Sequence, residues 1–336
     1  MIKKILITSI IIIFAFSLYA NFVHNEIFYS RNELSDLDTT SYGKGISISF
    51  KSGKYTLKGN LLVPKTSGRK FPVIIFSVGS AASSYASNYT KFLDSLFEMN
   101  LPLDSVALLY FDKRGIGQSE GKWFNTSFEE RAADVKAAAD YLKTLSNIDT
   151  NKIAVVGHSQ GGWIVQICLA KYPETFVGGI SMAGPTFSVK KQLINDYQTK
   201  FICTENLDSI KANRKAEKSV NRDLVFTSLF PFKENWKQLK VIKHFEPSNY
   251  LKKIDKPILL MFAENDALVY PNWCLNALSN VFPNGLPHNF DTMVIKEANH
   301  GFKISSLCFN GSFKTIPYSY DCKKAILNWT QQFLLK

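Results

Sequence analysis

Six continuous apolar runs, separated by helical patterns, limit the folds that are open to this chain. The runs lie at 71–78, 106–111, 153–157, 178–183, 258–263 and 292–295. An apolar run without polar alternation is typical of a strand that is covered on both faces, as in a parallel sheet. We therefore predict an α/β fold with a mostly parallel, doubly wound sheet and right-handed crossovers.

Two segments before these runs, at 46–50 and 57–63, alternate apolar and polar residues instead. This alternation predicts half-buried antiparallel strands at one edge of the sheet. Apolar residues recur at helical spacing in 128–142, 160–171, 272–282 and 322–335. A Ser/Thr-x-x-Glu capping box precedes the first of these helices.

The stretch at about 186–250 has no strand pattern and holds twelve Lys or Arg residues against seven Asp or Glu residues. Its helix-compatible segments carry aromatic residues, so we predict a helical lid inserted after the sixth strand. Residues 45–336 are assigned to one α/β domain that includes this lid. Residues 24–44 are polar and are assigned to a linker.

The first 23 residues form a separate segment. Two lysines precede an apolar run that reaches about Leu18, and Ser17 or Ala20 offers a small residue for cleavage, which is typical of a secretory signal. Extended to residue 23, the run is also long enough for an uncleaved anchor. Both interpretations predict an exported protein, periplasmic or secreted, and leave membrane anchoring by residues 1–23 open.

Export makes disulfide bonds permissible. Of the five cysteines, Cys308 and Cys322 flank a polar loop and are the expected bridge. A weaker prediction pairs Cys203 with Cys274, and Cys168 is expected in the core. No spacing of cysteine or histidine residues indicates a zinc site.

The net charge of +12 comes from scattered lysines, without an Arg-rich stripe or a nucleic-acid motif. We expect a soluble basic surface and no nucleic-acid partner. The alternative is attraction to an acidic substrate or to anionic lipid, as a peripheral membrane association. The sequence leaves the oligomeric state open.

The strongest functional signal is the sequence GHSQGG at 157–162, which lies between a predicted strand and a predicted helix. This is the context that a G-x-S-x-G nucleophile elbow requires. The glycines allow a sharp turn and close packing of strand and helix. Ser159 is therefore the predicted nucleophile.

A serine nucleophile needs a histidine base that a carboxylate orients. His300 follows the last predicted strand and Asp266 follows the strand before it, which is the chain order expected of base and acid. Glu264 is the alternative acid. His158 is predicted to support the elbow rather than to abstract a proton.

The oxyanion of an acyl-transfer intermediate needs two N–H donors. We predict the N–H of Gln160 and the N–H of Ser80, with Ala81 as the alternative to Ser80. Substrate contacts are predicted for Trp163, Ala183 and Pro185. The sequence DKRGIGQS at 112–119 lacks the spacing of a phosphate loop and is interpreted as a tight turn with a paired Asp112 and Arg114.

Four segments together resemble the α/β-hydrolase superfamily of serine hydrolases: the turn at 112–119, the elbow at 157–161, the acid loop at 263–269 and the base loop at 299–301. The sequences LKGNLLVP (57–64) and FSVGS (76–80) further resemble exported bacterial esterases related to serine aminopeptidases and dienelactone-hydrolase-like proteins. Such relatives usually show His-Gly where this chain has Val-Gly. The resemblance implies the α/β-hydrolase fold and a Ser-Asp-His triad, and it leaves the substrate open.

The predicted function is hydrolysis of a small ester or acyl molecule through an acyl-enzyme, without a metal or organic cofactor. The same triad fits a peptidase, a thioesterase, a lysophospholipase or an acyltransferase. A peptidase needs acidic groups for the substrate amine, and Glu205, Asp208 and Glu217 in the lid are candidates. A catalytically inactive exported binding protein is the alternative from a different class.

Overall fold

The sheet of this protein follows the predicted plan. A computed structural model describes residues 2–23, 45–65 and 68–336. In this part of the chain one sheet has the strand order β1-β2-β4-β3-β5-β6-β7-β8. The strands are β1 (Ile46–Ser52), β2 (Tyr55–Leu62), β3 (Phe71–Ser77), β4 (Ala107–Phe111), β5 (Ile148–His158), β6 (Gly178–Met182), β7 (Ile258–Ala263) and β8 (Phe290–Ile295).

Strand β2 runs antiparallel to β1 and β4, and the pairs from β4 through β8 are parallel. The predicted mostly parallel sheet with an antiparallel edge is therefore confirmed. The described helices are α1 (Ile2–Leu18), η1 (Tyr19–Val23), α3 (Thr90–Leu93), η2 (Asp94–Glu98), η3 (Trp123–Asn125), α4 (Phe128–Leu142), α5 (Gln160–Lys171), α6 (Val189–Glu205), α7 (Ser209–Leu229), α8 (Glu234–Ile242), α9 (Ser248–Leu251), α10 (Pro271–Val281) and α11 (Tyr320–Phe333).

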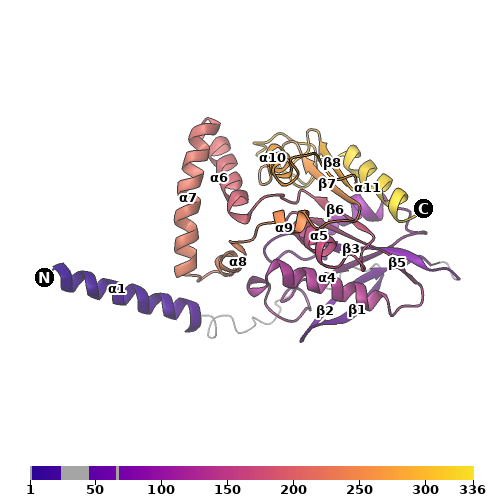
Figure 1. Ribbon diagram of the computed structural model, residues 1–336, viewed down its shortest axis with the longest axis horizontal. Coiled ribbons are helices and arrows are strands. Elements are labelled where there is room, and N and C mark those ends of the chain that lie inside the picture. The colour runs from indigo at the N-terminus through magenta and orange to yellow at the C-terminus, as the bar shows by residue number, and fades with distance from the viewer. Residues whose placement is uncertain (1, 24–44, 66–67) are drawn as a thin grey trace.

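Helices α6 to α9 are inserted between β6 and β7, as predicted for the helical lid. Figure 1 shows α6 and α7 side by side and standing away from the sheet. The predicted linker at 24–44 lies outside the described residues.

Two apolar cores, one on each face of the sheet, explain the continuous apolar runs. Along β3, Val73 and Ile75 join the core that contains residues of α4 and α5, whereas Ile74 and Phe76 join the core that contains residues of α3, η2 and α11. Successive side chains of a strand point to opposite faces, so a strand covered on both sides needs apolar residues at every position.

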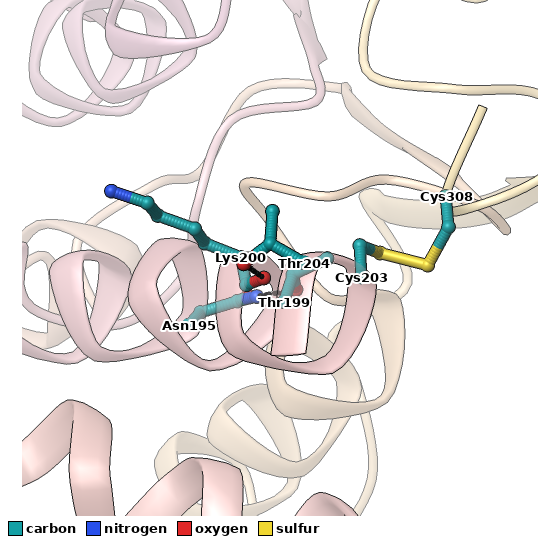
Figure 2. The surroundings of a disulfide bond; sticks show 6 residues. All are labelled: Asn195, Thr199, Lys200, Cys203, Thr204 and Cys308. Atoms are coloured by element: carbon teal, nitrogen blue, oxygen red, sulfur yellow. Dashed lines mark hydrogen bonds between the residues drawn. A yellow bond between two sulfur atoms is a disulfide. The ribbon is translucent and has the colours of Figure 1, made fainter. Parts of the chain in front are cut away.

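A disulfide bond joins Cys203 of α6 to Cys308 in the loop after β8, with the Cα atoms 5.2 Å apart (Figure 2). The predicted pairs Cys308–Cys322 and Cys203–Cys274 are therefore wrong. Cys274 and Cys322 are buried thiols that pack in the cores, as Cys168 does. The actual bridge spans 105 residues of sequence, and no local loop pattern indicates such a distant pairing.

Candidate active site

Ser159 lies in a strained turn between β5 and α5. Its backbone has φ 57° and ψ −121°, which is rare for a residue with a side chain and is typical of a nucleophile elbow. A Cβ atom at Gly157 would lie 2.2 Å from the carbonyl oxygen of Gly161, so the turn closes only with glycine there. The N–H of Ser159 donates to the carbonyl of Met182 at 2.8 Å and ties the elbow to β6.

His300 and Asp266 form a close pair at the carboxyl ends of neighbouring strands β7 and β8. The Nδ1 atom of His300 lies 2.9 Å from Oδ1 and 2.8 Å from Oδ2 of the fully buried Asp266. The N–H groups of Leu268 and Val269 donate to Oδ1 of the same carboxylate, each at 2.8 Å. With Nδ1 as donor to Asp266, the neutral imidazole of His300 keeps its lone pair on Nε2, which suits a general base.

His158, next to Ser159, links the elbow to the base loop. Its Nε2 atom lies 2.8 Å from the backbone carbonyl oxygen of His300, which only accepts, so Nε2 carries the proton. The hydroxyl of Tyr89 therefore donates to Nδ1 at 2.7 Å, and the same hydroxyl accepts from the N–H of Gly79 at 2.9 Å. Burial, with the charge of nearby His300, lowers the pKa of His158 to about 3, so this ring stays neutral.

The loop after β3 lies against the elbow. A Cβ atom at Gly79 would be only 3.3 Å from Cβ of Ser159. Within the described residues, the N–H groups of Ser80 and Gln160 donate no hydrogen bond to another residue. Both residues line the cavity above Ser159, so both N–H groups are candidates for binding an oxyanion.

The buried Lys113 fixes the orientation of this loop. Its Nζ donates to the carbonyl of Gly79 at 2.9 Å and of Ser80 at 3.3 Å, and it also bonds the carbonyl of Ala81. Because C=O and N–H point in opposite directions in a trans peptide, holding the Gly79 carbonyl turns the Ser80 N–H away from Lys113. Sequence analysis missed this role, although the lysine stands within the glycine-rich turn.

Arg131 of α4 is a second buried cation that holds the same region, and it was also missed. It donates to the carbonyl of Val78 at 2.5 Å and to the side-chain oxygen of Gln160 at 3.2 Å. Burial lowers the pKa of Arg131 to about 10. The arginine therefore connects the loop after β3 with the residue that follows Ser159.

The predicted pairing of Asp112 with Arg114 is wrong. Arg114 forms ion pairs with Asp134 at 2.8 Å and with Glu130 at 2.9 Å instead. Asp112 accepts the backbone N–H of Tyr85 at 3.2 Å, and burial raises its pKa to about 6. Both carboxylate partners of Arg114 belong to α4, which packs next to the turn only in the folded chain.

A cavity of about 670 Å³ lies between the elbow and the lid. The residues lining it include the predicted Ser80, Ser159, Gln160, Trp163 and Pro185. The predicted Ala183 does not line it, because its side chain is fully buried in one of the cores. Trp163 Nε1 and Gln238 Nε2 are buried at this cavity, and neither has a hydrogen-bond partner among the described residues.

A second cavity, of about 490 Å³, lies next to His300. His300 lines it together with aromatic residues that include Phe92, Phe313 and Tyr318. Leu268 borders both cavities. Ser159 thus lines the larger cavity and His300 lines the second one.

Two carboxylates of the lid, Asp196 on α6 and Asp223 on α7, line the larger cavity. Burial raises the pKa of Asp196, an effect that nearby His300 opposes. The predicted amine-binding candidates do not line this cavity. Glu205 pairs with Lys215, Asp208 caps α7, and Glu217 accepts from Asn213.

Comparison with known proteins agrees with this geometry. The family model described as serine aminopeptidase, S33, matches residues 82–280, which is more than half of the chain. Est1E from Butyrivibrio proteoclasticus, solved with bound ferulic acid, is 16% identical with a TM-score of 0.53, over 86% of this chain and 100% of that one. The esterase Pf2001 from Pyrococcus furiosus is 17% identical with a TM-score of 0.58, over 86% of this chain and 91% of that one.

The α/β hydrolase GrgF from Penicillium sp. sh18 is 15% identical with a TM-score of 0.58, over 87% of this chain and 99% of that one. At these identities the solved structures establish the fold, and the family match establishes the relationship. The chain belongs to the serine aminopeptidase S33 family of α/β hydrolases.

Proposed function

We propose that this hydrolase is a serine esterase that cleaves carboxylic esters through an acyl-enzyme. The observation that carries the proposal is the pairing of His300 with the buried Asp266, in a loop that hydrogen-bonds the elbow carrying Ser159. In this proposal Ser159 is the nucleophile, His300 is its base and Asp266 is the carboxylate that orients the base. The similarity of the fold to that of the esterase Pf2001 supports the same chemistry.

In the acylation step the Oγ of Ser159 attacks the acyl carbon while its proton passes to Nε2 of His300. The negative charge that develops on the acyl oxygen is bound by the N–H groups of Gln160 and Ser80. The intermediate then collapses, the ester C–O bond breaks, and His300 returns the proton to the departing alcohol. Asp266 holds the ring and stabilises its charged form.

In the deacylation step a water molecule gives a proton to His300 and attacks the acyl-enzyme. The Ser159 ester bond breaks, the carboxylic acid leaves, and the proton returns to Ser159. The larger cavity, which Trp163 and Pro185 line, holds the acyl group, and the second cavity beside His300 accepts the alcohol. Its aromatic lining favours an apolar leaving group.

The test is hydrolysis of p-nitrophenyl esters from acetyl to palmitoyl by the full-length chain. Turnover with one preferred chain length is expected, and the Ser159→Ala variant should lose at least about 1,000-fold of kcat. Ser279→Ala, an exposed serine on α10, serves as the matched control. Equal turnover by the wild type and Ser159→Ala would refute the assignment. Absence of turnover together with failure of Ser159 to react with a fluorophosphonate would favour an inactive binding protein.

A second candidate function, aminopeptidase activity, is favoured by the carboxylates of Asp196 and Asp223 in the larger cavity. A carboxylate there suits the ammonium group of a peptide N-terminus. Aminoacyl p-nitroanilides distinguish the two functions. A peptidase would cleave them with turnover that is lost in Ser159→Ala, whereas an esterase would leave them intact, and Asp196→Asn would raise KM for the charged substrate alone.

A further inference from the structure

Helix α1, together with the short helix η1 that continues it, has the dimensions of a membrane span. Residues Ile5–Phe22 form an 18-residue window with a mean hydropathy of 2.2. At about 1.5 Å per residue this window is about 27 Å long, close to the roughly 30 Å hydrocarbon core of a bilayer. Its apolar side chains are mostly exposed, and this surface is too large to remain in water.

The carboxyl end of this helix contacts the lid. Ser17 Oγ and Asn21 Nδ2 donate to the carbonyl oxygen of Leu229, at 2.9 and 3.1 Å. The ring of Phe16 lies 5.8 Å from that of Phe230 and 5.3 Å from that of Phe232. In Figure 1 the carboxyl end of α1 lies beside the carboxyl end of α7 and the neighbouring α8. If α1 enters a bilayer, the lid is therefore at the membrane surface.

The lid exposes apolar side chains in the same place. We define the lid patch as Val225, Phe226 and Leu229 of α7 together with Val241 of α8, whose exposed fractions run from 42% to 61%. Lys233 and Lys240 are exposed on or next to α8, and Lys240 donates to the side-chain oxygen of Asn21. Apolar side chains beside lysines suit the boundary between acyl chains and anionic headgroups.

The lid patch is continuous with the larger cavity. Phe226 belongs to the patch and also lines the cavity, and its ring lies 5.6 Å from that of Trp236, another lining residue. A molecule that leaves the membrane at the patch would thus meet the wall of the cavity that contains Ser159.

We propose that α1 remains attached as a membrane anchor, that the lid patch rests on the lipid surface beside it, and that the cavity takes long-chain lipid esters directly from the bilayer. The substrate class rests on the proposed esterase function, whereas the placement of the lid does not. Contact of α1 with the lid, rather than with another face, is the observation that fixes this orientation.

The placement is tested with the full-length chain in vesicles of phosphatidylcholine and phosphatidylglycerol whose acyl chains are brominated near the headgroup. We expect the bromine to quench the fluorescence of Trp236, so quenching should fall sharply in Trp236→Phe and persist in the control Trp273→Phe. Undiminished quenching in Trp236→Phe, or no quenching in the wild type, would overturn the placement. Absence of quenching in the wild type is also the result expected if another copy of this chain or a soluble protein covers the lid.

The substrate class is tested by the rate on p-nitrophenyl palmitate in these vesicles divided by the rate on soluble p-nitrophenyl butyrate. The triple variant Val225→Ser, Leu229→Ser, Val241→Ser should lower this ratio about tenfold, because less apolar surface is buried in lipid. Met99→Ser and Tyr320→Ser, which alter exposed apolar residues outside the lid, should leave it unchanged. An unchanged ratio in the triple variant would contradict the proposal.

Intact mass of the protein from the membrane fraction tests the anchor itself. The full-length mass is expected, and a mass that lacks the first 17 or 20 residues would overturn the proposal. Failure of the esterase function remains distinguishable, because it would abolish the Ser159-dependent turnover and leave the bromine quenching of Trp236 intact.

Discussion

The Nε2 atom of His158 lies 2.8 Å from the carbonyl oxygen of His300, so the residue before Ser159 holds the backbone of His300. Tyr89 extends the same chain of hydrogen bonds to Gly79. The neutral imidazole of His158 therefore links the elbow, the loop that carries His300 and the loop after β3. Protonation of His158 would turn its Nδ1 into a donor and break the bond from Tyr89.

His158 should make the fold sensitive to acid. Its folded pKa of about 3 lies below the ordinary value of 6.5, so its contribution to stability is present above pH 6.5 and is lost as the pH falls toward 3. The shift corresponds to about 5 kcal/mol over that range. The free energy of unfolding, measured with urea at several pH values, should fall less steeply with decreasing pH for His158→Gln than for the wild type. The exposed His288→Gln should match the wild type, and identical slopes for all three proteins would contradict the prediction.

Asp266→Asn should lower kcat by about 10⁴-fold, because an amide neither holds the required tautomer of His300 nor stabilises its charged form. The thermal midpoint should change little, since the amide oxygen still accepts from Leu268 and Val269. The control is Glu264→Gln, whose carboxylate accepts the N–H of Glu297 instead. The measurement is kcat of each variant on one ester. A larger loss of kcat in Glu264→Gln than in Asp266→Asn would assign the role of the orienting carboxylate to Glu264.

Lys113→Met should lower kcat by about 100-fold while KM changes little, because the carbonyls of Gly79 and Ser80 lose their donor and the Ser80 N–H loses its orientation. The assay is run well below the midpoint of thermal unfolding so that all protein is folded. Lys54→Met, at an exposed lysine, is the matched control. A KM effect without a kcat effect would assign Lys113 to ground-state binding.

Replacing both Cys203 and Cys308 by serine should cost about 2–4 kcal/mol of unfolding free energy, because the bond no longer restricts a 105-residue separation in the unfolded chain. For a chain of 336 residues the thermal midpoint should fall by roughly 3–6 °C. Scanning calorimetry checks this. Reductant should lower the thermal midpoint of the wild type to that of the variant and leave the midpoint of the variant unchanged. If reductant also lowers the midpoint of the variant, the effect does not come from this disulfide bond.

Local pattern was sufficient to predict the sheet, the inserted helices and the position of the elbow. Strands such as β3 and β7 are read from short apolar runs, and Ser159 lies in a motif whose flanking strand and helix are contiguous in sequence. The partners of Arg114, by contrast, lie on α4. Lys113 and Arg131, the cations that hold the loop after β3, bond backbone carbonyls that carry no sequence signal.

The lid was the least predictable part for the same reason. Composition indicated its helices. Which of their carboxylates reach the cavity depends on how α6 and α7 are rotated about their axes. Asp196 and Asp223 face the cavity, whereas Glu205 bonds a surface lysine. The bond between Cys203 and Cys308 likewise depends on the docking of α6 against a loop far along the chain.

That bond also closes a covalent ring around the middle of the catalytic domain. Strands β7 and β8 and the residues Asp266 and His300 all lie between Cys203 and Cys308 in sequence. A protease cut within α7 or α8 would leave two fragments that still travel as one band on a non-reducing gel. A single cut between the two cysteines therefore cannot separate α6 from the loop that follows His300, and a reductant is needed as well.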